Sequence, residues 1–181
     1  MADLFSCEKQ YVSPEQRREI VRELVQSLRN PIFLAGTAYH AIMTKAGIPL
    51  QRLRYAKDID LFVPDTDEAQ RILAPLGYEE RFDKYAKGQT QRKKRVGEVE
   101  LKTGKAIPAY LGIDLIGRPY FTKYCPEEKR NAVSEHLQET SDNSNMFGFP
   151  INVQGLESLL LSKLLSLNRA EGGYYLCKRR C

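Results

Sequence analysis

The segment KDIDLFV, residues 57–63, decides how this chain is interpreted, because it places two carboxylates inside an otherwise apolar run. Alternate side chains of an extended strand share a face, so Asp58 and Asp60 point one way while Ile59 and Leu61 point the other. The Cα atoms of the two acids would lie about 7 Å apart, and their charges repel unless a cation lies between them. A divalent metal ion is one explanation. A half-exposed strand with a solvated acidic face is the other.

The size and composition of the chain are those of one globular domain. Its 181 residues are 42% hydrophobic, which is enough for a substantial core. We expect a single domain over 1–181, with its core at about 30–120 and a C-terminal helical part at about 121–181. No run approaches the ~20 apolar residues of a membrane span, and the start lacks an apolar signal-peptide core. Four cysteines without CxxC spacing indicate reduced thiols, and their spacing does not support a zinc site with His40 and His136. These features predict a cytoplasmic protein with no membrane contact.

The remaining sequence predicts helices mixed with strands. Ser13 is typical of an N-cap, with Pro14 in the first turn and Gln16 completing a capping box, before a helix that ends near Leu28. Further helices are predicted at about 37–45, 66–76, 126–138 and 155–168, strands at 32–35, 58–63, 109–116 and 150–153, hairpins over 78–104 and a loop over 139–145. Their unequal spacing favours an α+β (mixed α/β) fold, with a mixed sheet, helices packed on one face and a C-terminal helical segment.

The positive charge of the chain is concentrated in residues 84–105. This stretch has eight lysines and arginines against two glutamates, although the whole chain has a net charge of only +5. A basic stripe of this kind binds nucleic acid or a polyphosphate, whereas a solvated hairpin tip has the same composition.

Asp114 is a lone acid in a second apolar strand, 109–116. It shares a face with Tyr110 and Gly112. If this strand neighbours the one that carries the acid pair, at the ~4.8 Å spacing of a sheet, Asp114 lies beside the pair. Three converging carboxylates suit two hard cations about 3.5–4 Å apart. Taken alone, Asp114 is equally consistent with an acid at a strand end.

An apolar strand runs through Gly36 directly into a helix, which presents backbone N–H groups and a helix dipole to an anion. Gly36 permits a close backbone approach, and Thr37 can cap the helix or donate to a phosphate. Ordinary tight-turn chemistry also explains this junction.

Lys163 lies near the middle of an apolar helical stripe, where a cation must extend to solvent or meet an anion such as a metal-bound triphosphate. The stripe consists of Leu156, Leu159, Leu160, Leu164 and Leu167.

Taken in order, these features resemble the nucleotidyltransferase superfamily of the DNA polymerase β type. Residues 33–63 carry its glycine turn followed by the acid pair, and residues 112–116 resemble its third-acid strand. Residues 150–165 are similar to the small bacterial branch typified by abortive-infection toxins, in which a short strand leads to a leucine-rich helix with a lysine. The resemblance covers roughly residues 32–168.

The resemblance implies transfer of a nucleoside monophosphate from an NTP, such as ATP, to an acceptor hydroxyl, with release of pyrophosphate. It implies two Mg²⁺ (or Mn²⁺) ions, both held by Asp58 and Asp60. Asp114 would bind the catalytic ion and help to activate the attacking hydroxyl. The turn at Gly36 and Thr37 would hold the β- and γ-phosphates.

The resemblance also extends to two basic residues and to the partners. Lys163 would contact phosphate or stabilise developing charge, and Arg54 corresponds to an arginine that the branch often carries before the acids. The acceptor would be RNA such as a tRNA end, given the basic stretch, or a protein, or a small molecule such as an antibiotic. A protein partner such as an antitoxin is a further expectation. The alternative is a catalytically inactive protein of the same fold that binds nucleotide or RNA or mediates a protein contact.

Overall fold

The computed structural model describes residues 12–48, 58–81, 89–100, 103–118 and 130–162. Its strands are β1 (Ile32–Phe33), β2 (Asp58–Phe62), β3 (Tyr78–Glu80), β4 (Gln89–Glu100), β5 (Ala106–Ile116), β6 (Asp142–Ser144) and β7 (Ile151–Val153). Its helices are α1 (Pro14–Ser27), α2 (Ala35–Lys45), α3 (Thr66–Leu73) and α4 (Arg130–Glu139), with the short 3₁₀ helix η2 (Ala74–Leu76) after α3. A further helix begins at residue 156.

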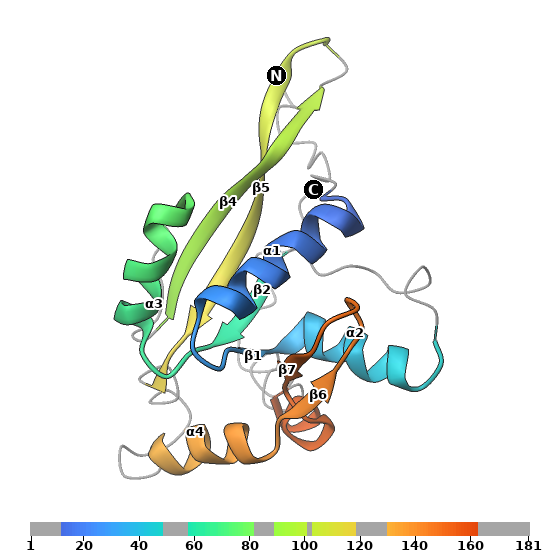
Figure 1. The fold of residues 1–181 in the computed structure, drawn as a ribbon, viewed down its shortest axis with the longest axis vertical. Coiled ribbons are helices and arrows are strands. Elements are labelled where there is room, and N and C mark those ends of the chain that lie inside the picture. Colours follow the sequence, from blue (N-terminus) through green and yellow to red (C-terminus); the bar gives the residue numbers. More distant parts are fainter. Residues whose placement is uncertain (1–11, 49–57, 82–88, 101–102, 119–129, 163–181) are drawn as a thin grey trace, which may run out of the picture.

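Within these described residues the strands form one seven-stranded sheet in the order β3–β4–β5–β2–β1–β7–β6 (Figure 1). The pairs β2–β5 and β1–β7 are parallel, and the other neighbours are antiparallel. The predicted mixed sheet is therefore confirmed.

One face of the sheet carries the main hydrophobic core. Ile59 and Leu61 of β2 are fully buried there, together with Ile113 and Leu115 of β5. Apolar residues of α1 and α3 close this core, and Figure 1 shows α1 lying across the sheet. The side chains between these aliphatic residues must therefore point to the opposite face.

A smaller apolar cluster lies on that opposite face, at the C-terminal ends of β2 and β5. It consists of Ile32, Leu34, Phe62, Ile116 and Leu137. Because Leu137 belongs to α4, this helix adds an apolar contact beyond the expected layer of helices on one face.

The predicted capping box of α1 is confirmed, and it also ties the helix to the sheet. The backbone N–H of Ser13 donates to Gln16 Oε1 at 2.8 Å, and that of Gln16 donates to Ser13 Oγ at 3.2 Å. Gln16 Nε2 additionally donates to the carbonyl of Val96 in β4 at 2.5 Å. Arg17, which is only 4% exposed, donates to the carbonyl of Asp58 at 3.2 Å. Helix α1 therefore fixes both the long β4–β5 hairpin and the start of β2.

One prediction about the C-terminal region was wrong. The polar stretch 139–145 contains β6, which pairs with β7 through its backbone and needs no apolar side chains. In the helix that begins at residue 156, Leu159 is buried, whereas Leu156 and Leu160 are 50% and 55% exposed. Leu164 and Leu167 of the predicted stripe lie outside the described residues. No helix in the described part of the chain is long and apolar enough to cross a bilayer.

Candidate active site

The parallel pairing of β2 with β5 brings the three aspartates to one patch of the sheet. Asp60 is the register partner of Asp114, and Asp58 is the register partner of Gly112. Paired Cα atoms on neighbouring strands lie about 4.8 Å apart, and all three acids occupy the face opposite the main core. The expectation that the two acidic strands are neighbours is thus confirmed.

Gly112 makes the space in which the carboxylate of Asp58 lies. A Cβ atom built on Gly112 would approach Asp58 Oδ1 to 2.2 Å and Asp58 Cγ to 3.1 Å. Any larger residue would force the carboxylate to move. The sequence places Gly112 on the acidic face, but nothing in the sequence alone indicates this contact.

The two carboxylate oxygens of Asp114 differ in their hydrogen bonding. Its Oδ2 accepts a hydrogen bond from Gln89 Nε2 at 3.2 Å, whereas its Oδ1 is buried without a partner among the described residues. Burial raises the pKa of Asp114 and the charge of Asp58 adds to this, while hydrogen bonds from Gln91 and Gln89 and the charge of Arg81 act in the opposite direction. A buried carboxylate oxygen without a donor is a natural ligand for a cation.

The start of α2 lies beside the acidic patch. The N–H of Leu34 donates to the carbonyl of Asp60 at 2.8 Å, and α2 begins at the next residue, Ala35. The positive end of the α2 dipole is therefore close to Asp60, where it favours an anionic ligand.

The β1–α2 turn differs from the prediction in its detail. Ala35, not Gly36, has a positive φ, of 45°, and Gly36 lies inside the helix. Gln154 holds the strained residue, because its backbone N–H donates to Phe33 O at 2.8 Å and its Oε1 accepts from Ala35 N–H at 3.3 Å. The N–H of Ala35, at the start of α2, is therefore occupied by a side chain from beyond β7.

Thr37 does not cap α2, contrary to one of its two predicted roles. It is the third residue of the helix and is 2% exposed, and no side-chain cap hydrogen bond is formed. Its hydroxyl oxygen is buried without a partner in the described part of the chain. A buried hydroxyl without a partner is unusual, and the contact of Thr37 with a phosphate stays a prediction.

The donor set suits a divalent cation, although no closed cage exists. In the described residues no group of three or more His, Cys, Asp or Glu side chains is arranged to hold a metal ion. The carboxylate of Asp58 rests against Gly112, and one oxygen of Asp114 is held by Gln89. Because the strand pairing already sets the Cα spacing, rotation of side chains rather than movement of strands would bring these oxygens together. Carboxylate oxygens are the ligands that Mg²⁺ prefers.

The central part of the basic stretch, residues 92–95, is divided between the two faces of the sheet, and each of its four basic side chains has a partner. Arg92 and Lys94 lie on the core face and contact Gln70 and Glu23, respectively. Lys93 and Arg95 lie on the other face and pair with Glu79 and Glu98.

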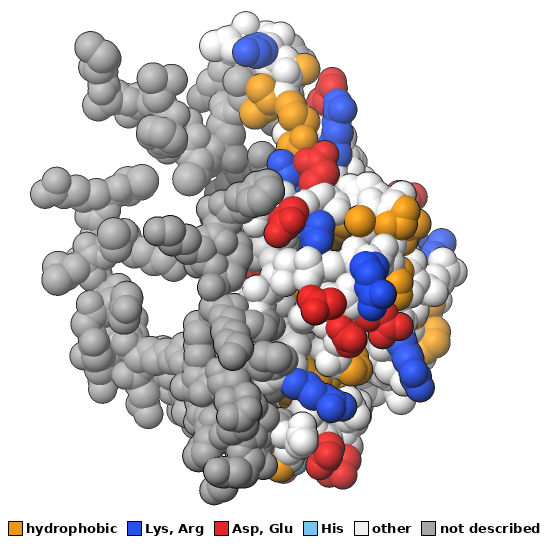
Figure 2. All heavy atoms as spheres, turned by 90° about the vertical axis from the view of Figure 1, so that its left-hand side faces the viewer, with side chains coloured by type: hydrophobic (Ala, Val, Ile, Leu, Met, Phe, Trp, Pro, Cys, Tyr) orange, Lys and Arg blue, Asp and Glu red, His pale blue; other side chains and the backbone are white. Residues whose placement is uncertain are grey.

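Acidic and basic side chains are interspersed on the side of the molecule seen in Figure 2. Arg92, Lys93, Lys94 and Arg95 are therefore spread over both faces of the sheet, and Lys84, Lys87 and Lys102 lie outside the described residues.

The sequence analysis missed several groups around the acids, and two of its candidates cannot be placed. Gln89, Gln91 and Arg81 act on Asp114 and escape sequence inspection, because glutamine and arginine in a hairpin carry no distinctive signal. Arg54 and Lys163 lie outside the described residues.

No model of a known protein family matches the sequence, and no curated protein matches it at a significant level. Among solved structures, the chain is similar to small alarmone synthetase 1 from Bacillus subtilis. With the form bound to its product pppGpp the TM-score is 0.31 at 10% identity, over 69% of this chain and 89% of that one. A second structure of the same enzyme has a TM-score of 0.30 at 11% identity, over 87% of this chain and 91% of that one. The form bound to AMPCPP has a TM-score of 0.27 at 10% identity, over 87% of this chain and 90% of that one. At TM-scores this low the similarity says nothing about activity, and the proposal of a function rests on the site.

Proposed function

We propose that this chain is a metal-dependent nucleotidyltransferase, which moves a nucleoside monophosphate from an NTP to an acceptor hydroxyl. The observation that carries the proposal is the pairing of Asp60 with Asp114, with Asp58 two residues before Asp60 on the same face. Two features support it, because they offer a cation ligand and an anion site. One is Asp114 Oδ1, which has no partner among the described residues, and the other is the start of α2 beside Asp60.

Each residue has a distinct part in this proposal. Asp58, Asp60 and Asp114 would hold two Mg²⁺ or Mn²⁺ ions, which when bound neutralise phosphate charge and lower the pKa of a bound hydroxyl. The start of α2, with the hydroxyl of Thr37, would orient the β- and γ-phosphates. Arg54 remains a candidate for nucleotide contact and Lys163 for contact with phosphate, on the strength of the sequence.

Asp114 is the best candidate for the proton acceptor. A base works most effectively when its pKa approaches the working pH. Burial raises the pKa of Asp114 in the metal-free protein, whereas bound cations would lower it. The acceptor oxygen would form a bond to the α-phosphorus while the bond to the β-phosphate oxygen breaks. The hydroxyl proton passes to Asp114, and pyrophosphate leaves with the electron pair.

A label-transfer assay tests the proposal. The full chain is incubated with Mg²⁺ or Mn²⁺, with each NTP labelled at the α-phosphate, and with total RNA or a protein extract as acceptor. We expect transfer of label that Asp58→Asn and Asp60→Asn each reduce by at least about 100-fold, as expected when a charge used in the transition state is removed. Asp142→Asn is the matched control, because Asp142 is exposed on the distant strand β6 and should leave transfer unchanged.

Two outcomes would contradict the proposal. Transfer that survives both substitutions would place the chemistry elsewhere. Metal-dependent NTP binding without transfer to any acceptor would favour the alternative, an inactive protein of this fold that binds nucleotide.

A further inference from the structure

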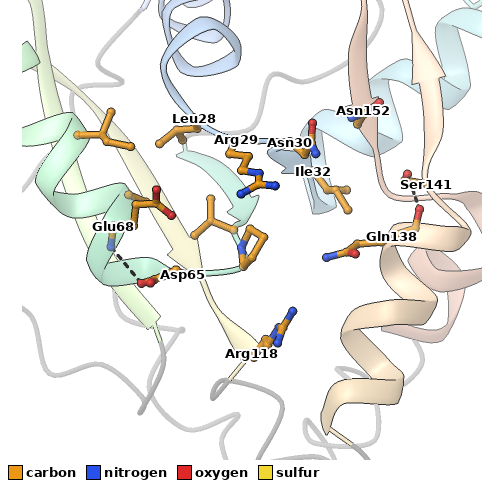
Figure 3. A pocket seen from close by; sticks show the side chains of 14 residues that line it. Leu28, Arg29, Asn30, Ile32, Asp65, Glu68, Arg118, Gln138, Ser141 and Asn152 are labelled. Carbon is orange, nitrogen blue, oxygen red and sulfur yellow. Dashed lines mark hydrogen bonds between the residues drawn. The ribbon is translucent and has the colours of Figure 1, made fainter.

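A cavity of about 610 Å³ lies at the end of the sheet where β2 and β5 finish. It is lined by Val63 and Pro64 after β2, by Arg118 after β5, and by residues of α3, α4 and the segment that follows α1 (Figure 3). Val63 is three residues beyond Asp60, which is about 10 Å along a strand. None of the three aspartates lines the cavity.

Three polar side chains from distant parts of the sequence point into this cavity. Figure 3 shows Arg29, from the segment after α1, and Arg118, from the end of β5, entering it from different sides. Gln138 of α4 points into it from a third direction. Asn30 next to Arg29 has a φ of 47°, which turns the chain sharply into β1.

The cavity lining also contains two acidic residues, Asp65 and Glu68, which have different surroundings. Asp65 caps α3, because its Oδ1 accepts hydrogen bonds from the N–H groups of Asp67 at 2.9 Å and Glu68 at 3.0 Å. The negative charge of Asp65 is therefore partly compensated by the N–H groups and the dipole of α3. Glu68 also lines the cavity and opposes the binding of an anion there.

We propose that this cavity binds the phosphate monoester of a small polar molecule, at a site independent of the three aspartates. Two guanidinium groups match the double negative charge of a phosphate monoester, and each can bind two of its oxygens with its planar fork. The amides of Gln138 and Asn152, which both line the cavity, suit the hydroxyl groups of the rest of the ligand. The volume lies within the range of about 300–1,000 Å³ that small-molecule sites occupy.

Calorimetric titration of the full chain with AMP, glucose 6-phosphate and citrate, in the presence of EDTA, tests this inference. We expect at least one phosphate monoester to bind without metal. Arg29→Gln and Arg118→Gln should each weaken that binding about tenfold or more, the loss expected for one charge-assisted pair. Glu68→Gln should strengthen it. Both arginines are exposed, so these variants should fold normally.

Matched controls separate this site from the aspartates. Arg95→Gln removes the same charge from the β4–β5 hairpin and should leave binding unchanged, as should Asp60→Asn. The inference is overturned if no phosphate monoester binds, if only the carboxylate probe citrate binds, or if Asp60→Asn abolishes binding while the arginine variants retain it. The label-transfer assay is scored separately with Asp58→Asn and Asp60→Asn, so either proposal can fail while the other holds.

Discussion

Gly112 and Asp58 share a space that holds only one side chain, since a Cβ on Gly112 would lie 2.2 Å from Asp58 Oδ1. The atom that must give way is the end of a side chain, so Gly112→Ala should fold with little loss of stability. We expect the displaced carboxylate to weaken Mn²⁺-dependent NTP binding by about tenfold or more, equivalent to about 1.4 kcal/mol. Calorimetric titration and a thermal melt measure the two effects separately.

A double variant identifies the cause of that loss. If Gly112→Ala acts only through Asp58, then Gly112→Ala combined with Asp58→Asn should bind no more weakly than Asp58→Asn alone. Additive losses would mean that Gly112 acts in some other way.

Because the pKa of Asp114 is raised in the folded protein, we expect its contribution to stability to fall as the pH rises. In the unfolded chain this carboxyl ionises at about its ordinary pKa of 3.8. Between that value and the raised one, the folded protein retains a proton that the unfolded chain has lost, so the contribution of Asp114 to the free energy of unfolding falls as pH rises. At neutral pH without metal, Asp114→Asn should therefore melt at a higher temperature than the wild type.

The same measurement in acid provides the control. The difference between Asp114→Asn and the wild type should shrink as the pH is lowered through 3.8, because both states carry the proton only well below that value. Binding of Mn²⁺ should weaken over the same range, because a protonated carboxyl is a poor ligand. An Asp114→Asn variant that melts below the wild type at neutral pH would show that its charge stabilises the metal-free fold.

Arg17 links α1 to the first residue of β2. Because it is 4% exposed and donates to the carbonyl of Asp58, Arg17→Met leaves that carbonyl without this partner. We expect a loss of about 1–3 kcal/mol in the free energy of unfolding, measured by urea denaturation. Arg18→Met, at the next and exposed position, should change it by less than about 0.5 kcal/mol. Equal effects at both positions would contradict this role.

Gln16 has two roles, whereas Ser13 has one. Ser13→Ala removes the cap of α1 and should cost about 1 kcal/mol. Gln16→Ala removes its part of the capping box and also the hydrogen bond to Val96, so it should cost more. Urea denaturation of the two variants gives the comparison, and a smaller loss for Gln16→Ala would contradict the second role.

The local features of this fold could be predicted from the sequence because they depend on near neighbours. The strand period of two places Asp58 and Asp60 on one face, and the capping box at Ser13 and Gln16 fixes the start of α1. Strand β6 was missed, because an edge strand held by backbone hydrogen bonds needs no apolar pattern.

The features that depend on strand pairing could not be predicted in the same way. The sequence allowed Asp114 to lie beside Asp60 but did not require it, since it does not specify which strands are neighbours. The strain at Ala35 depends on Gln154, which is far away in the chain. The cavity between Arg29 and Arg118 forms only when segments distant in sequence meet.

The central claim is that the paired Asp60 and Asp114 hold a divalent cation together with a nucleotide, and one titration tests it most directly. The full chain is titrated calorimetrically with a non-hydrolysable NTP, with and without Mn²⁺, and compared with Asp60→Asn and Asp114→Asn. We predict that the wild type binds the nucleotide tightly only with Mn²⁺ and that both variants lose this metal-dependent binding. Equal nucleotide binding in all three proteins, or binding that does not depend on Mn²⁺, would contradict the claim.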